Sequence, residues 1–313
     1  MVKQIDLNLG SIATKQPLVF ARHETFHPRF GWLKKGFDRA SQDSGVFLED
    51  DATVRLGVGK NMVRSIRYWA SAFKLLAEDQ PTEFGVQLLG DSGWDPYLED
   101  PASLWLLHWK LLEHTAESPC ETTAWYVAFN YFRRAEFTFE GLFDELCDFR
   151  DRHSPRTANS SIKKDVSCLL RMYVRQPAKS LASEDSLDCP FTQLDLIHTA
   201  GDARHYTFRV GYKPNLPPEI VVYACLQHAN RTVSGQTIPV AKLLYDIGSP
   251  GLAFRLTESA LCDAIEQVER RYGQIRVSDA AGKLQVSFDA EAWVLADEIL
   301  NRYYEAAWHG SND

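Results

Sequence analysis

The sequence between Asp50 and Leu76 constrains the fold most strongly, because it has the pattern of an amphipathic helix with a buried face. Apolar side chains recur there at spacings of four and three residues, at Met62, Ile66, Trp69, Phe73 and Leu76. This spacing places all of them on one side of a helix, where they can pack against a hydrophobic core. The segment is therefore predicted to be a core helix.

A second face of the same helix is basic. The same spacings recur in polar side chains, at Lys60, Arg64, Arg67, Ser71 and Lys74. No acidic residue lies between Ala52 and Ala77 to neutralise these charges locally. A basic helix face is typical of proteins that bind the phosphates of nucleic acids. The alternative is the solvated outer face of an ordinary core helix, because charge runs are often only that.

The residues around this helix predict a helix-turn-helix followed by a hairpin. Residues 52–56 can form a short helix, and Gly57 and Gly59 permit a tight turn before Lys60. After a polar break at residues 78–81, short apolar runs flank the turn-forming residues 90–93, which predicts a hairpin wing within residues 83–98. We therefore expect an N-terminal winged-helix-like DNA-binding domain over residues 1–98.

A nucleotide-binding phosphate loop is the competing interpretation of the GVGK sequence at residues 57–60. The first glycine of such a loop would have to stand at Val54, and the magnesium-binding Ser or Thr would have to stand at Asn61. Neither requirement is met, so we set this interpretation aside.

The remaining segments predict a mainly α fold with short β-hairpins. Residues 99–176 are expected to form a helical middle layer, and residues 177–216 a loop and hairpin connector. Residues 217–313 contain three helical segments followed by an alternating segment at 274–288, which is the order of a second winged-helix-like domain. The predicted architecture is thus two tandem winged-helix-like domains joined by a helical layer. Acidic residues face outward on the last of these three helices, which suits a protein partner better than DNA.

The charge distribution is uneven. The chain has 34 Lys and Arg against 42 Asp and Glu, a net charge of -8, so any nucleic-acid site must be a local patch. Residues 22–74 and 150–175 are both locally basic. The six cysteines form no CxxC pair and are expected to stay reduced. No secretory leader or membrane-spanning run is evident, so we expect a cytoplasmic protein without membrane contact.

A catalytic site is harder to predict. Residues 23–27 read HETFH, which matches the HExxH pattern of zinc peptidases. Pro28 opposes that function, because a residue before proline avoids the helical region and His27 would leave the helix of His23. Phe30 and Leu33 also occupy the glycine and third-histidine positions of the extended metzincin motif.

The same cluster could instead belong to a site that cleaves phosphodiesters. His23, Glu24 and His27 are the candidate catalytic residues. Glu24 with Asp50 and Asp51 could hold Mg²⁺ or Mn²⁺, since hard cations prefer carboxylate oxygens. The alternative is a loop whose aromatic residues pack on the core while its charges are solvated. The candidate DNA contacts are Arg29, Lys34, Lys35, Arg55, Lys60, Asn61, Arg64, Arg67 and Lys74.

The run HETFHPRFGWLKKGFDRA, followed by DDATVRLGVGKNMVRSIRYWASAFKLL, resembles the N-terminal signature of the SspB-like proteins of bacterial single-stranded DNA phosphorothioation systems. GDSGWDPYLEDPASLWLLHW continues the resemblance, which is most specific over residues 23–109. It implies a DNA nicking protein that acts with a divalent metal in a sulfur-incorporation and phage-defence pathway. It also implies three partners: a cysteine desulfurase, an ATP-pyrophosphatase-like protein and an ATPase.

Three functions therefore remain open: a DNA nickase, a non-catalytic DNA-binding adaptor, and a scaffold for protein partners. The resemblance favours the first, because no catalytic spacing is evident in the residues themselves.

Overall fold

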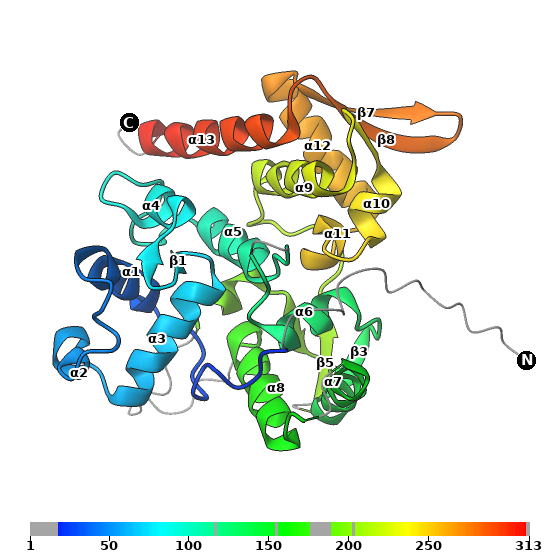
Figure 1. The fold of residues 1–313 in the computed structure, drawn as a ribbon. Helices are drawn as coiled ribbons and strands as arrows, with labels where there is room; N and C mark the ends of the chain where they lie inside the picture. The colour runs from blue at the N-terminus through cyan, green and yellow to red at the C-terminus, as the bar shows by residue number, and fades with distance from the viewer. Residues whose placement is uncertain (1–17, 116–117, 154–155, 176–188, 202–203, 311–313) are drawn as a thin grey trace, which may run out of the picture.

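The computed structural model describes residues 18–115, 118–153, 156–175, 189–201 and 204–310. These residues form a mainly helical protein with three small antiparallel sheets (Figure 1). Residues 177–188, at the start of the expected loop and hairpin connector, lie outside the described residues. No helix in the described ranges has both the length and the apolarity needed to cross a bilayer.

The N-terminal unit contains the predicted helix-turn-helix. It consists of α1 (Trp32–Gln42), α2 (Ala52–Leu56), α3 (Lys60–Ala72), the two-residue strands β1 (Leu76–Ala77) and β2 (Gln80–Pro81), and α4 (Glu83–Leu89). The predicted stripe of α3 is confirmed, since Ile66, Trp69 and Phe73 are fully buried and Met62 packs partly against the core. α1 crosses α3 closely at Gly36, where a Cβ atom would lie 2.7 Å from a methyl group of Ile66.

The prediction of a hairpin wing at residues 83–98 was wrong. Residues 83–89 form α4, which begins where the Thr82 hydroxyl accepts a hydrogen bond from the Gly85 amide. The short apolar run could not distinguish strand from helix by its periodicity, whereas the threonine cap is a helix signal. A much smaller hairpin precedes α4, with Glu78 and Asp79 at its turn, both with positive φ.

The middle unit is built around a helix that is buried on all sides. This is α5 (Pro101–Leu111), in which every residue after the first proline is buried. The elements that follow are α6 (Thr123–Asn130), β3 (Glu136–Thr138), α7 (Phe139–His153), α8 (Asn159–Tyr173), the 3₁₀ helix η2 (Pro190–Leu194), β4 (Ile197–Thr199) and β5 (His205–Phe208). The hairpin expected within residues 177–216 is present as β4 and β5, but β5 also pairs with β3. The predicted boundary between helical layer and connector therefore runs through one sheet.

The C-terminal unit contains the three predicted helices and the predicted hairpin. Its elements are α9 (Pro218–Thr232), β6 (Thr237–Pro239), α10 (Val240–Tyr245), α11 (Pro250–Ala253), α12 (Glu258–Tyr272), β7 (Ile275–Ala280), β8 (Lys283–Phe288) and α13 (Ala292–Gly310). β6 pairs with β8, as β3 pairs with β5 in the middle unit. Both units thus share one order: a helix, a strand, helices and a hairpin whose last strand returns to the first. Sequence reasoning missed this repeat in the middle unit.

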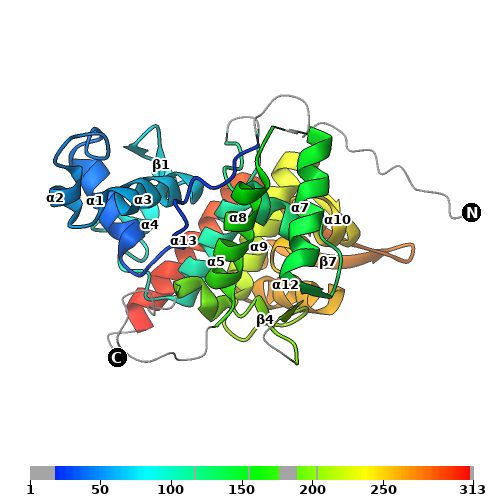
Figure 2. The ribbon, with the colours of Figure 1, turned by 90° about the horizontal axis from the view of Figure 1, so that it is seen from below.

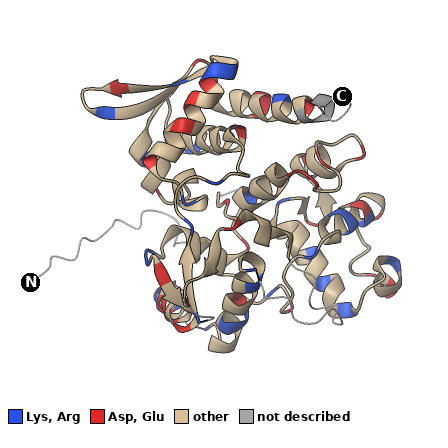
Figure 3. Ribbon diagram, turned by 180° about the vertical axis from the view of Figure 1, so that it is seen from behind, with Lys and Arg blue, Asp and Glu red and all other residues tan. Residues whose placement is uncertain are grey.

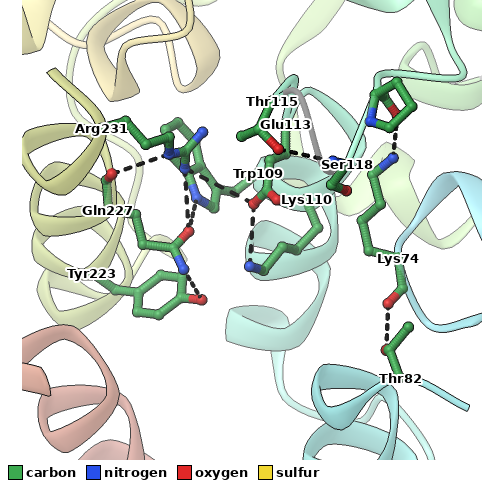
Figure 4. A network of polar contacts seen from close by, with 11 residues as sticks. Lys74, Thr82, Trp109, Lys110, Glu113, Thr115, Ser118, Tyr223, Gln227 and Arg231 are labelled. Atoms are coloured by element: carbon green, nitrogen blue, oxygen red, sulfur yellow. Dashed lines mark hydrogen bonds and ion pairs between the residues drawn. The ribbon is translucent and has the colours of Figure 1, made fainter. Parts of the chain in front are cut away.

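Polar contacts fasten the middle and C-terminal units together. The Arg255 guanidinium lies 3.9 Å from the centre of the Phe208 ring and donates to the Ala128 carbonyl at 2.7 Å. Figure 4 shows a second connection, in which Glu113 after α5 pairs with Lys110 at 3.2 Å and with Arg231 of α9 at 3.9 Å. The buried apolar side chains of the three units form one continuous core.

Candidate nucleic-acid interface

The N-terminal half of α3 presents an open cationic surface. Lys60 and Asn61 are exposed, and within the described part of the chain their side chains make no hydrogen bond or ion pair. Arg64, one turn later, has 55% of its side chain exposed and reaches Glu24 at 3.4 Å. No side chain caps the helix at Gly59. The free amides of this first turn and its positive dipole end favour an anion such as a phosphate.

The cationic side chains in the C-terminal half of α3 are paired with other groups of the protein. Arg67 makes a two-pronged ion pair with Asp79, with both nitrogen–oxygen distances at 2.7 Å. Lys74 points to the Pro119 carbonyl, to which it donates at 2.5 Å (Figure 4). Of the predicted DNA contacts on α3, the structure therefore leaves Lys60, Asn61 and Arg64 accessible and engages Arg67 and Lys74 within the protein.

The predicted cations Lys34 and Lys35 of α1, and Arg29 just before it, also have intramolecular roles. Lys34 pairs with Asp38 at 2.8 Å and donates to the Leu89 carbonyl at 3.0 Å, while Lys35 donates to the Leu56 carbonyl at 3.2 Å. The guanidinium of Arg29 stacks near the rings of Phe26 and Trp32. These contacts join α1 to its neighbours, which makes the three side chains part of the fold.

Arg55 is paired as well. It donates to Asp43 at 2.7 Å, and this hydrogen bond, together with one from the Gly45 amide, holds the pKa of the Asp43 carboxyl below its usual value. Like the α1 cations, Arg55 is therefore less available to phosphate than Lys60.

The side chain of His23 is buried and is not accessible to solvent. Residues 22–25 form a turn, not the helix that a HExxH zinc site requires, and His23 has no exposed surface. Its Nδ1 accepts a hydrogen bond from the Thr25 amide at 3.1 Å, so the ring hydrogen is on Nε2, which donates to Asp165 at 2.8 Å. Both ring nitrogens are occupied, which leaves His23 neither a base facing solvent nor a metal ligand. Its contacts are those of a core histidine, stacked near Trp69.

The other predicted catalytic and metal-binding residues do not converge. Glu24 is engaged by Arg64, and His27 contacts the Pro28 carbonyl through Nδ1 at 3.2 Å. Asp50 and Asp51 are exposed just before α2. Across residues 18–310, apart from the gaps given above, no three His, Cys, Asp or Glu side chains are grouped closely enough to hold a metal ion.

Comparisons with known proteins decide the family. A family model described as a protein of unknown function (DUF4007) matches residues 20–304. A crystal structure of SspB is 39% identical, covers 92% of this chain and 88% of the other, and superposes with a TM-score of 0.85. The chain belongs to the SspB-like family. A crystal structure of magnesium-ion-bound SspB matches at 38% identity over the same shares of both chains, with a TM-score of 0.86.

No curated protein sequence matches the chain. The similarity to SspB extends well beyond residues 23–109, where the sequence carries the clearest resemblance, because it covers all three units. The SspB-like fold therefore includes residues that sequence reasoning missed. Asp165 and Arg171 of α8 both contact the turn that holds His23, Glu24 and Thr25. The basic segment 150–175 was the signal in the sequence that could have drawn attention to them.

Proposed function

We propose that this SspB-like protein binds DNA through the N-terminal half of α3 and nicks it with a divalent metal ion during phosphorothioate modification. The observation that carries the DNA-binding part is the open first half of α3. There, Lys60, Asn61 and Arg64 surround a helix N-terminus in the second helix of a helix-turn-helix. Cationic side chains and free amides placed together in this way bind phosphates without reading base sequence.

The similarity to SspB supports two parts of this proposal, the phosphorothioation pathway and the magnesium ion. Membership of the SspB-like family supports a role in the Ssp phosphorothioation system, with a cysteine desulfurase, an ATP-pyrophosphatase-like protein and an ATPase as proposed partners. The magnesium-bound SspB structure supports Mg²⁺ as the ion, and Mn²⁺ is the proposed substitute. Among the described residues no three His, Cys, Asp or Glu side chains are grouped, so a Mg²⁺ site built from them would use at most two such side chains, with water or DNA phosphate completing its shell. Among the predicted ligands, the exposed Asp50 and Asp51 fit that description better than Glu24.

A DNA-binding adaptor is the second candidate, and a specific observation favours it. Both ring nitrogens of His23 are occupied, so the predicted base is committed to the fold, and among the described residues Glu24 belongs to no group of three His, Cys, Asp or Glu side chains. In that case the chain would deliver DNA to a partner that cuts it.

A plasmid assay separates the two candidates. Highly purified protein is incubated with supercoiled plasmid and either Mg²⁺, Mn²⁺ or EDTA, and open circles are quantified through successive purification steps. A nickase is expected to give metal-dependent open circles whose specific rate stays constant on further purification. Loss of the nicking with purification, while DNA binding persists, would leave only the adaptor.

A matched pair of variants locates the metal. Asp50→Asn/Asp51→Asn is expected to lower the nicking rate at least tenfold, because removing the charge of a metal-binding carboxylate weakens the ion's binding. The control is Asp91→Asn, which removes one exposed carboxylate on the loop after α4. Equal rates for both variants and the unaltered protein would remove Asp50 and Asp51 from the proposed site.

A further inference from the structure

A single turn of the chain lies between α3 and α8. In Figures 1 and 2, the dark-blue start of the described chain passes between these two helices. Arg64 of α3 reaches the Glu24 side chain at 3.4 Å, and Arg171 of α8 donates to the Thr25 carbonyl at 2.6 Å. The two arginines thus approach neighbouring residues of one turn, from two different units of the protein.

The turn holds α3 and α8 in a fixed relation. His23 connects it to Asp165 of α8, and the Trp69 indole of α3 donates to the Phe26 carbonyl at 3.0 Å. Glu24 and Thr25 both have positive φ, a conformation that non-glycine residues keep only where the surroundings enforce it. The spacing between the exposed ends of the two helices is therefore set before any ligand binds.

α8 is the last α-helix before the hairpin that returns to the first strand, as α12 is in the C-terminal unit, although η2 lies between α8 and its hairpin. In winged-helix proteins this helix commonly enters the DNA groove. Lys164 and Arg171 are exposed and stand seven residues apart, so they share one face of α8. Arg22, also exposed, lies on the intervening turn. α12 differs, because acidic residues predominate along it in Figure 3.

We propose that α3 and α8 form one continuous DNA-binding surface, in which Arg22, Lys164 and Arg171 extend the contacts of Lys60 and Arg64 along the phosphate backbone. This inference rests on the proposed DNA-binding function and assigns the middle unit a direct part in it. The exposed pair of Arg64 and Glu24 is weak, so a phosphate can replace the carboxylate as partner of the guanidinium. Lys164 needs no such exchange, because within the described residues its side chain has no hydrogen bond or ion pair.

Lys164 is the best residue for a test, because replacing Arg171 would also release the Thr25 carbonyl. The affinity for a labelled duplex is measured over a series of salt concentrations for Lys60→Ala, Lys164→Ala and the double variant. The control is Lys283→Ala, an exposed lysine of the distant β7–β8 hairpin. Thermal melts confirm that each variant is folded.

Each alanine variant on the surface is expected to make the negative slope of log affinity against log salt shallower by about 0.9. This corresponds to about an eightfold loss of affinity near 0.1 M salt. The slope for the double variant should change by the sum of the two single changes. Lys283→Ala should leave the slope unchanged. A shallower slope for Lys60→Ala with an unchanged slope for Lys164→Ala would overturn the extended surface and leave DNA binding by α3 intact. Unchanged slopes for both would overturn the proposed function as well.

Discussion

Two buried histidines are expected to stabilise the folded protein at pH 7 by a contribution of which roughly 6 kcal/mol, about half from each, is lost when the pH is lowered to 4. His108 donates through Nε2 to the Ala253 carbonyl at 2.9 Å, and its Nδ1 contacts the Tyr173 hydroxyl at 2.7 Å. Burial lowers the pKa of His108 to about 4. His228 donates to the Gly248 carbonyl at 3.1 Å, and burial likewise lowers its pKa to about 4.

The direction of this effect follows from proton binding. In the unfolded chain these histidines take up a proton near pH 6.5, whereas in the folded protein they remain neutral until about pH 4. The unfolded state therefore binds more protons between these values. The stabilisation is fully present above pH 6.5 and is lost as the pH falls towards 4, by about 1.4 kcal/mol per pH unit for each histidine.

Urea unfolding at pH 7, 6 and 5 measures this slope, at pH values where few carboxylates titrate. His108→Gln keeps a donor for the Ala253 carbonyl but cannot titrate, so it should halve the slope. His198→Gln changes an exposed histidine and serves as the control. A free energy of unfolding that stays constant between pH 7 and 5 would contradict the expected proton uptake.

Replacing Asp165 by alanine is expected to destabilise the protein by about 3 kcal/mol, since one buried donor and one partly buried donor would lose their acceptor. These donors are His23 Nε2, at 2.8 Å, and the Ala21 amide, at 2.7 Å. Asp165 itself is almost completely buried, so water cannot easily take its place. The substitution should also free the turn between α3 and α8, because His23 would lose its attachment to α8.

Chemical denaturation gives the change in stability, and amide hydrogen exchange at residues 23–26 reports on the turn. Asp165→Asn keeps one acceptor oxygen and should cost less than the alanine variant. Asp38→Ala removes a half-exposed carboxylate that pairs with Lys34 on the same helix, a kind of pair that contributes at most about 1 kcal/mol. Equal losses for Asp165→Ala and Asp38→Ala would show that the buried contacts of Asp165 do not stabilise the turn.

Much of the fold was predictable where a long segment repeats its apolar residues at helical spacing. α3, three helices of the C-terminal unit (α9, α10 and α12) and its β7–β8 hairpin were predicted from such patterns, whereas α11 and α13 were not. α4 was missed because its apolar run is only seven residues long. The sheet of the middle unit was missed for a different reason. β3 and β5 are separated by more than sixty residues, and periodicity does not identify the partner of a three-residue strand.

The candidate site was only partly predictable. The basic face of α3 was evident, but its charge balance depends on residues outside the helix. Asp79 neutralises Arg67 from the turn after β1, and Pro119 binds Lys74 from the loop before α6. His23 had the spacing of a catalytic motif, yet its partner Asp165 lies 142 residues further along the chain. Local patterns cannot reveal contacts that the tertiary fold creates.

The salt dependence of duplex binding by two α3 variants tests the central claim most directly. Lys60→Ala/Arg64→Ala removes both accessible cations of the first half of α3, while Arg67→Gln removes one from the half that Asp79 closes. The double variant is expected to make the negative slope of log affinity against log salt shallower by about 1.8. Arg67→Gln is expected to leave the slope unchanged. An unchanged slope for the double variant would contradict DNA binding by the open half of α3.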